Sequence, residues 1–399
     1  MRDYCVLVSI FIFVVAALAA PKSVHAQPTE VAFLDGDGQW QWIEVPNGSA
    51  FAAKAGAPSE DRAGPFNVIY EDIELATGLG FDDPELGEER RDTLWAVLDY
   101  IGQVIDVPGE ADLFIRESQT DGGGALASAG PFLIPESGFQ SGLVFEHLTT
   151  GVDPSPTVPD GTVTVDFGFP WNSGLGPVGQ DEQDLFTTLL HEVTHSLGVL
   201  SVVASDGRSA VFNSGDRGLF SVFDSLLIRE STEVPVFLDG GELNSTADDF
   251  VASGDLVFAG ERARRVLGFY PRVFAPRTFF EGSSIGHWSS LNGRSVMLPA
   301  LSRGSERRQY EPWEVQALAD LGYEVFAPEP PPLPVGVEAE VPFGSDSDDA
   351  DEPVGALSPG TRSGCAVESN ARSRVPFWAV FLGLVALGRR TRRRVHYTQ

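Results

Sequence analysis

The sequence predicts an α+β domain in which a twisted mixed sheet packs against helices. Three observations favour this class: a strand, a helix and a second strand open the foldable region, short apolar runs separated by Gly and Pro follow, and a helix-forming run comes next. This patterning is confined to residues 65–327, so one domain is predicted there. A chain of 399 residues is long enough to bury a sizeable core.

The expected elements follow one another from residue 66. Helices are predicted over residues 88–105 and from Asp181 to Gly198, where Asp181 can cap the first turn and Gly198 can end the helix. Strands are predicted where short apolar runs are bounded by turn residues: 66–70, 111–115, 125–134, 142–145 and 162–167. The last run is expected to be an edge strand above a cleft, where it could pair with an extended peptide.

The first 26 residues have the features of a secretory signal peptide. A short basic start is followed by an apolar run at 6–20 and by a small-x-small cleavage site at 24–26, so the protein is expected to leave the cytoplasm. Residues 27–64 are a separate N-terminal segment rich in Gly, Ala and acidic residues. Its DGDG run at 35–38 is interpreted as a turn, because the acid and glycine of a calcium loop are missing after it.

The composition changes abruptly after residue 327. Residues 328–374 form a Pro-rich and then acidic stretch, which is typical of a disordered linker. Residues 375–399 hold a short hydrophobic segment and an arginine cluster. The apolar part is shorter than the roughly 20 residues of a stable span, so a marginal membrane anchor or a sorting signal is expected. The arginines would leave the C-terminus in the cytoplasm.

Cys365 precedes the hydrophobic segment, and the whole tail resembles the tripartite C-terminal sorting tails of myxobacterial surface proteins. This resemblance covers the tail alone and implies processing or lipidation near Cys365 by a sorting protease. Display in the cell envelope or at the cell surface, or release into the medium, would follow. The final VHYTQ departs from tails that stop at the arginines. An incidental exposed thiol is the alternative for Cys365.

Charge and cysteine content exclude some classes of protein. The formal net charge of -30 argues against nucleic acid or anionic lipid as a partner of the soluble part. The two cysteines are Cys5, inside the signal, and Cys365, in the tail, so no intrachain disulfide can join parts of the predicted domain. Packing, together with any bound metal ion, must therefore stabilise it.

The run LLHEVTHSLG contains the residues that point to chemistry. His191 and His195 are four residues apart, which places two imidazoles on one face of a helix where both can bind one ion. Glu192 is close enough to take a proton from a zinc-bound water without being a ligand. A catalytic zinc has three protein ligands and an open position, so a third ligand is required.

The histidines that could provide this third ligand are few, because the chain has six in all. Ser201 stands where the most familiar extension of the motif has its third histidine. His25 belongs to the signal and His396 follows the hydrophobic segment. His147 and His287 remain.

Two alternatives to His287 stay open. His147 lies in a strand-like run before the helix and is expected to be a structural or edge-strand histidine. Glu261 could supply a carboxylate ligand, although its arginine neighbours favour a solvated helix face.

The surroundings of His287 carry a resemblance to a known family. His287 lies in GSSIGHW, and Met297, the only methionine after the signal, follows in VMLPA. Together with HEVTHSLG and the closing segment YEPWEVQALADLGYEV, these runs resemble leishmanolysin-type metzincins, in which a long insertion precedes the third histidine. The resemblance extends loosely over residues 66–325, with specific motifs only in the second half.

This resemblance implies a metzincin-like zincin domain and a zinc-dependent endopeptidase that cleaves polypeptides. His191, His195 and His287 would hold Zn²⁺, Glu192 would be the general base, and Met297 would form the turn beneath the metal. The cleft would lie between a sheet-bearing half and a half with His287 and Met297. Leishmanolysin-type enzymes also carry many disulfides and a cysteine-bearing propeptide, which this domain does not have, so zymogen control is absent or works otherwise.

Other residues permit a second interpretation. Asp216 and Asp224 suit a second ion or a substrate loop, but also caps and turns. Tyr310 is a candidate to steady an oxyanion. The GSSIG run around Ser284 matches the nucleophile elbow of serine hydrolases, although no acid and separate histidine follow in the required order. A surface binding protein that kept the fold and lost catalysis is the remaining alternative.

Overall fold

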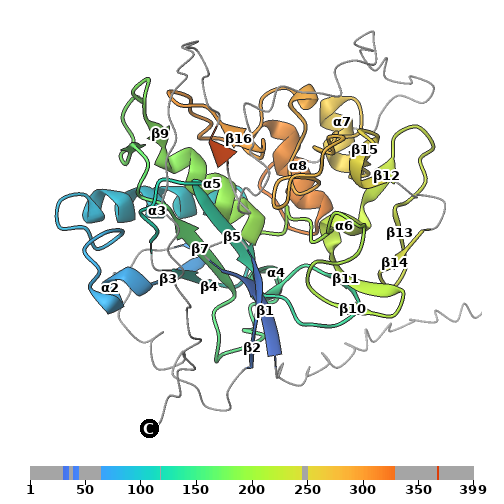
Figure 1. Ribbon diagram of the computed structural model, residues 1–399, viewed down its shortest axis with the longest axis horizontal. Coiled ribbons are helices and arrows are strands. Elements are labelled where there is room, and N and C mark those ends of the chain that lie inside the picture. Colours follow the sequence, from blue (N-terminus) through green and yellow to red (C-terminus); the bar gives the residue numbers. More distant parts are fainter. Residues whose placement is uncertain are drawn as a thin grey trace, which may run out of the picture.

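The computed structural model describes residues 30–35, 39–44, 64–116, 118–244, 250–328 and 366–367. These residues form a mixed α+β fold with twisted sheets, as the sequence predicts (Figure 1). The central sheet and its helices lie on one side of the molecule, and the small sheets and short helices of the C-terminal half lie on the other (Figure 1).

The central sheet contains, in spatial order, β3 (Phe66–Tyr70), β4 (Ala111–Ile115), β7 (Gly161–Val165) and β5 (Ala127–Pro131). The first three strands are parallel, and β5 pairs antiparallel with β7. Every residue of β7 is buried, as expected for a strand with neighbours on both sides. The prediction that residues 162–167 form the edge strand is therefore wrong, because β5 lies outside β7.

Helices α3 (Gly87–Gly102) and α5 (Leu185–Ser196) are the two longest in the described part of the chain, and the short α2 (Glu71–Leu75) precedes them. In α3 the buried residues Leu94, Leu98 and Ile101 recur at helical spacing, which gives one apolar face. Helix α5 packs against β5 and β7 on one side and against α3 on another. It is buried along its whole length, so its position is determined by tertiary packing.

The run at 142–145, predicted as a strand, instead begins helix α4 (Leu143–Thr150). A run of four mostly apolar residues fits a strand and a helix equally well, so the residues that follow it determine which of the two forms. Leu143, Val144 and Leu148 are buried on one face, and Gly142, at φ 84°, turns the chain into the helix. His147 therefore lies on α4 and not on an edge strand.

The N-terminal segment contributes a hairpin of β1 (Glu30–Leu34) and β2 (Trp40–Glu44). After β1, the Asp35 carboxylate accepts a hydrogen bond of 2.8 Å from the backbone N–H of Gln39, and residues 36–38 of the predicted turn lie outside the described residues. Ala32 exchanges backbone hydrogen bonds of 2.8 and 2.9 Å with Leu133, just beyond β5. Since Ala32 is fully buried, the hairpin packs onto the domain core.

The remaining strands form small sheets. One sheet contains β6 (Gly138–Gln140), β10 (Asn213–Ser214), β11 (Arg217–Ser221), β13 (Phe237–Leu238) and β14 (Glu242–Leu243). The other pairs are β8 (Trp171–Asn172) with β9 (Gln183–Asp184), β12 (Leu227–Arg229) with β15 (Leu256–Phe258), and β16 (Ala300–Leu301) with β17 (Ala366–Val367). Short 3₁₀ helices lie at Phe250–Ala252 and Ser290–Asn292.

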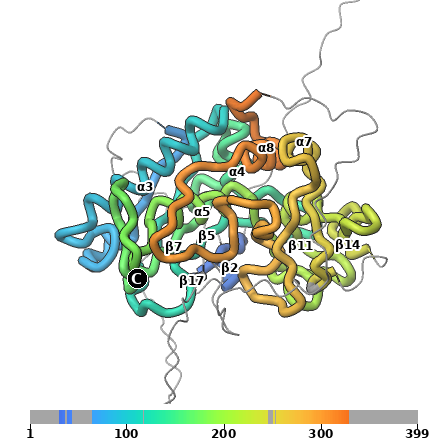
Figure 2. Tube along the Cα trace, turned by 90° about the horizontal axis from the view of Figure 1, so that it is seen from above, coloured from blue at the N-terminus to red at the C-terminus, as the bar shows by residue number. Residues whose placement is uncertain are grey.

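The C-terminal half also contains helices α6 (Val222–Ser225), α7 (Glu261–Leu267) and α8 (Pro312–Asp320). Helices α7 and α8 lie side by side (Figure 2). The Asp320 carboxylate at the end of α8 accepts hydrogen bonds of 3.0 and 2.9 Å from the backbone N–H groups of Arg262 and Ala263. It thereby satisfies the first turn of α7, whose free N–H groups need acceptors.

Several predictions fall outside the described residues. These are the signal peptide at 1–26, most of the linker at 328–374 with Cys365, and the hydrophobic and arginine-rich segment at 375–399. Within the described residues, no helix is both long enough and apolar enough to cross a membrane.

Candidate metal centre

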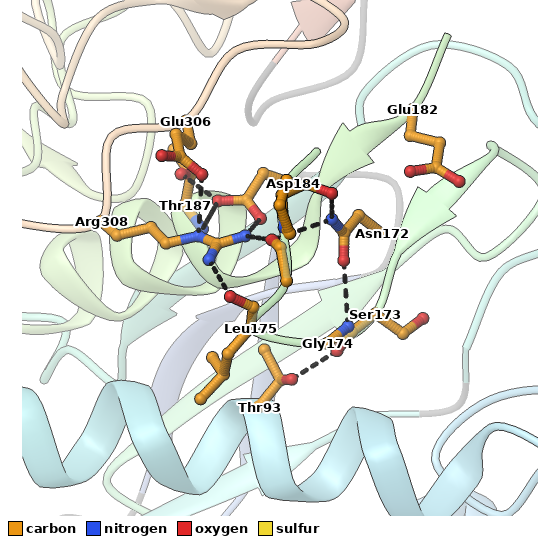
Figure 3. A network of polar contacts seen from close by, with 12 residues as sticks. Thr93, Asn172, Ser173, Gly174, Leu175, Glu182, Asp184, Thr187, Glu306 and Arg308 are labelled. Atoms are coloured by element: carbon orange, nitrogen blue, oxygen red, sulfur yellow. Dashed lines mark hydrogen bonds and ion pairs between the residues drawn. The ribbon is translucent and has the colours of Figure 1, made fainter. Parts of the chain in front are cut away.

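Helix α5 is held at its start by Asp184, not by Asp181 as predicted. The Oδ2 atom of Asp184 accepts hydrogen bonds of 3.2 Å from the Thr187 N–H and 2.6 Å from the Thr187 hydroxyl. Arg308 donates to both carboxylate oxygens of Asp184, at 2.9 Å from Nε and 2.6 Å from Nη2 (Figure 3). A bidentate pair fixes orientation as well as distance, so the first turn of α5 is tied to the segment before α8.

The other end of α5 is shaped by Gly198. This residue has φ 101°, a left-handed conformation that favours glycine, and it follows the C-cap Leu197 as the sequence predicts. The chain turns back sharply there, which brings the Val199 carbonyl to the His195 ring. His195 Nδ1 donates to that oxygen at 2.7 Å.

Three histidine rings converge at one point. The Nε2 atom of His287 lies 3.1 Å from Nε2 of His191 and 3.3 Å from Nε2 of His195. His191 and His195 lie on one face of α5, as their spacing predicts, whereas His287 comes from a loop 92 residues beyond His195. All three side chains are buried, so the cluster could hold a metal ion.

The hydrogen bonds of the rings define where their protons lie. Each Nδ1 faces a backbone carbonyl oxygen, that of Val296 at 2.9 Å for His191 and that of Ser283 at 2.8 Å for His287. A carbonyl oxygen can only accept, so each Nδ1 carries the proton and each Nε2 presents a lone pair. Three lone pairs that face one another repel, and a cation between them removes that repulsion.

The electrostatics of the cluster agree with neutral rings. Burial lowers the pKa of His195 to about 4 and that of His287 to about 3. Burial, followed by the two neighbouring imidazoles, also places the pKa of His191 well below its ordinary value. At neutral pH the three rings are therefore uncharged, each with its proton on Nδ1 and a free lone pair on Nε2, which is the form that binds metals.

Met297 and its neighbours lie next to His191. The carboxylate of Glu314, on α8, accepts hydrogen bonds from the Ser295 hydroxyl at 2.7 Å and from the Val296 N–H at 3.1 Å. The carbonyl of Val296 in turn accepts the Nδ1 proton of His191. The buried Met297 thus belongs to a turn that orients His191, and Glu314 holds this turn in place.

Glu192 lines a cavity of about 170 Å³ together with His195. The N-terminal hairpin contributes Leu34 and Trp40 to the same cavity, and the edge strand β5 contributes Ser128 and Ala129. Other lining residues come from the loops after α5 and before His287, among them Leu200, Ser201, Val202, Phe279, Gly282 and Ser284. The cavity therefore lies beside the histidine cluster, with a carboxylate in its wall.

The alternative third ligands lie elsewhere. His147 donates from Nδ1 to Asp160 at 2.8 Å and takes no part in the three-histidine cluster. Glu261 is half-exposed and lies 3.5 Å from both Arg264 and Arg265, as expected for a solvated helix face.

Ser284 has none of the contacts of a catalytic serine. Its hydroxyl accepts a hydrogen bond from the Phe280 N–H at 2.9 Å. The nearby His287 uses Nδ1 for the Ser283 carbonyl and Nε2 for the histidine cluster. Neither ring nitrogen is left to activate a hydroxyl.

The two aspartates of the insertion have the turn and cap roles that the sequence allows. Asp216 is exposed in the turn between β10 and β11. Asp224 is fully buried, forms a capping box with Ser221, and accepts a hydrogen bond of 3.2 Å from the Val202 N–H. Burial raises the pKa of Asp224 to about 6.

Tyr310 is not placed to steady an oxyanion in this structure. Its hydroxyl lies 2.5 Å from the Thr194 hydroxyl on α5, Tyr310 is not among the residues that line the cavity beside Glu192, and burial raises the pKa of Tyr310. It supports the helix instead.

Two features of the site were not predicted from the sequence. The hairpin residues that line the cavity carry no motif, so no local signal indicates their position. Glu314 could have been singled out, because an acidic residue at a position where α8 packs inward requires a buried partner.

No family model, curated protein or solved structure matches this chain.

Proposed function

We propose that this protein is an exported, zinc-dependent endopeptidase of the leishmanolysin-like metzincin type. The single observation that supports this most strongly is the convergence of three neutral imidazoles, each with its Nε2 lone pair directed at its neighbours. Three histidines with one open position are the ligand set of hydrolytic zinc sites. The motif resemblance and the cavity beside Glu192 support the same conclusion.

His191, His195 and His287 would hold the zinc ion. When bound there, zinc lowers the pKa of a water molecule towards neutrality and polarises a scissile carbonyl. Glu192 would accept a proton from the attacking water on its carboxylate and later pass that proton to the leaving amine. The turn at Met297 and the carbonyl acceptors at each Nδ1 would keep the rings oriented during turnover.

The substrate would be an extended polypeptide. Ser128 and Ala129 of the edge strand β5 line the cavity, so the backbone of a peptide could pair with that strand while its bond lies beside Glu192. Leu34, Trp40 and Phe279 would give one part of the cavity wall an apolar surface for a substrate side chain, while Gln39, Ser128 and Glu281 make other parts polar.

The proposal includes a cellular location. The signal peptide would export the chain, and the tail with Cys365 would attach it to the membrane or pass to a sorting protease. Cell fractionation should find the domain in the envelope, at the surface or in the medium. A pool of full-length chain in the cytoplasm would contradict this part of the proposal.

The catalytic role is tested by Glu192→Gln, measured with casein cleavage and with zinc content. We expect turnover to fall by about 10²–10⁴-fold because a general base contributes that much, while zinc stays bound. Glu261→Gln, on an exposed face, is the matched control and should leave both quantities unchanged.

Three results would count against the proposal. Casein cleavage by Glu192→Gln at the wild-type rate would remove Glu192 from the mechanism, and turnover insensitive to chelators would remove the metal. Zinc binding without any turnover by the wild-type protein would instead favour a catalytically inactive surface binding protein.

A further inference from the structure

A second cluster of metal-ligand side chains lies outside the three-histidine cluster. It consists of His147 on α4, Asp153 in the following loop and Asp160 directly before β7. The ligand-type atoms of these three residues lie within 4.8 Å of one another. No residue is shared with the first cluster, and the proposed endopeptidase activity makes no use of these side chains.

The contacts inside this cluster are short. His147 Nδ1 lies 2.8 Å from Oδ2 of Asp160, an oxygen that also accepts a hydrogen bond of 2.7 Å from the Asp112 N–H. Asp153 accepts from the Ser155 N–H at 2.7 Å, which bends the loop around its carboxylate. Pro154, Pro156 and Pro159 restrict this loop further, because proline fixes φ.

Two buried oxygen atoms at this place have no hydrogen-bond partner among the described residues. One is Oδ1 of Asp160, whose side chain is 1% exposed and whose other oxygen faces His147. The other is the hydroxyl of Ser155, a residue that is fully buried in the same loop. A buried polar atom without a partner destabilises the folded state, so an ion bound by Asp160 would account for its Oδ1 atom.

The charge around His147 favours a cation. Asp112, Asp153 and Asp160 all lie close enough to act on its charge, so three carboxylates surround one imidazole. The Asp160 carboxylate is 1% exposed, and a divalent ion would compensate for burying it.

We infer that His147, Asp153 and Asp160 form a second, structural site for a divalent transition-metal ion. One imidazole and two carboxylates suit zinc or manganese better than calcium, which takes oxygen ligands. Such an ion would join α4 and the loop at 151–160 to the central sheet, and would stabilise the domain without contact with the cavity beside Glu192.

The test counts zinc bound to the purified protein after removal of metal and reloading with Zn²⁺. Wild type should bind about two ions per chain, and His287→Ala and Asp153→Asn about one each, since each variant loses one ligand set. Asp153→Asn keeps the oxygen that accepts from Ser155, so the loop should still fold. Asp216→Asn, at an exposed turn, is the control and should bind as wild type does.

Thermal unfolding in the His287→Ala background separates this inference from the proposed function. Added Zn²⁺ should raise the Tm of His287→Ala, and the rise should vanish in the double variant with Asp153→Asn. Equal zinc counts for wild type and Asp153→Asn, or an equal rise in Tm for the single and double variants, would overturn the inference and leave His147 and Asp160 as a simple ion pair. Neither the zinc count nor the Tm depends on peptidase activity.

Discussion

The two histidine-containing clusters differ in the protonation of their imidazole rings and in the partners that these rings contact. In the first, three neutral rings have their Nδ1 protons bound by carbonyl oxygens, and their Nε2 lone pairs converge. In the second, a single ring, that of His147, lies against the carboxylate of Asp160 and can keep its proton. The first cluster therefore has no internal source of positive charge, whereas the second has one.

Because of this difference, the first cluster depends more on a bound cation than the second. In the first cluster, the Nε2 atom of His287 lies 3.1 Å from that of His191 and 3.3 Å from that of His195, and no proton lies between them. Without a metal ion, the three Nε2 lone pairs therefore repel one another. The His147 cluster can protonate its imidazole and form an ion pair. Metal should therefore bind more tightly to the first cluster, where no proton competes for the ligands.

The largest expected effect comes from removing one ring of the first cluster. His287→Ala should weaken zinc binding at that cluster by more than about 100-fold, since loss of an outer partner alone costs about 10–100-fold. His147→Ala is the matched change in the second cluster and should leave this affinity unchanged. Competition titration with a zinc chelator measures both variants. An unchanged affinity in His287→Ala would remove His287 from the ligand set.

A smaller effect should follow from loosening the turn that orients His191. Glu314→Ala removes the acceptor for Ser295 and Val296, so we expect zinc affinity at the first cluster to fall about 10-fold. Glu261→Ala, an exposed glutamate on α7, should have no such effect. Circular dichroism must show that Glu314→Ala remains folded. A folded variant with wild-type affinity would mean that the turn does not depend on Glu314.

The smallest effect on either cluster is expected from Asp224→Asn, which instead changes the response to pH. Burial raises the pKa of Asp224 from its ordinary 3.8 to about 6, so its contribution to stability is present below about pH 4 and is lost as the pH rises through 6. Asparagine mimics the protonated form. Between pH 4 and 7, metal-free wild type should therefore lose about 1–3 kcal/mol of unfolding free energy relative to Asp224→Asn.

Urea unfolding at a series of pH values measures this difference. Parallel stability curves for the two proteins would show that the Asp224 carboxyl does not titrate in that range. Because Asp160 has a pKa raised to the same value, it provides the comparison: zinc should change the pH dependence that Asp160 causes but not that of Asp224.

The sequence predicts the fold class and the start of α3 well, because an apolar face at helical spacing is a local signal, although the helix ends at Gly102, three residues before the predicted end. The spacing of His191 and His195 likewise predicts that both rings share a face of α5. The start of α5 was missed because the choice between Asp181 and Asp184 depends on Arg308, which is distant in sequence. The edge strand was predicted wrongly for a similar reason, since β5 precedes β7 in the chain but pairs outside it.

The proximity of His287 to α5 is a different case. The sequence suggested this proximity only by elimination and by family resemblance, because no local pattern indicates a contact between residues 92 positions apart. The hairpin beside the cavity and the cluster around His147 had no motif at all, since their members come from separate elements that only the folded chain brings together.

Zinc binding by the three histidines is tested most directly by the zinc K-edge X-ray absorption spectrum of Asp153→Asn protein loaded with one equivalent of Zn²⁺. We expect a shell dominated by three imidazole nitrogens at about 2.0–2.1 Å, which His287→Ala reduces. A shell of oxygen ligands, or a spectrum that His287→Ala leaves unchanged, would contradict it.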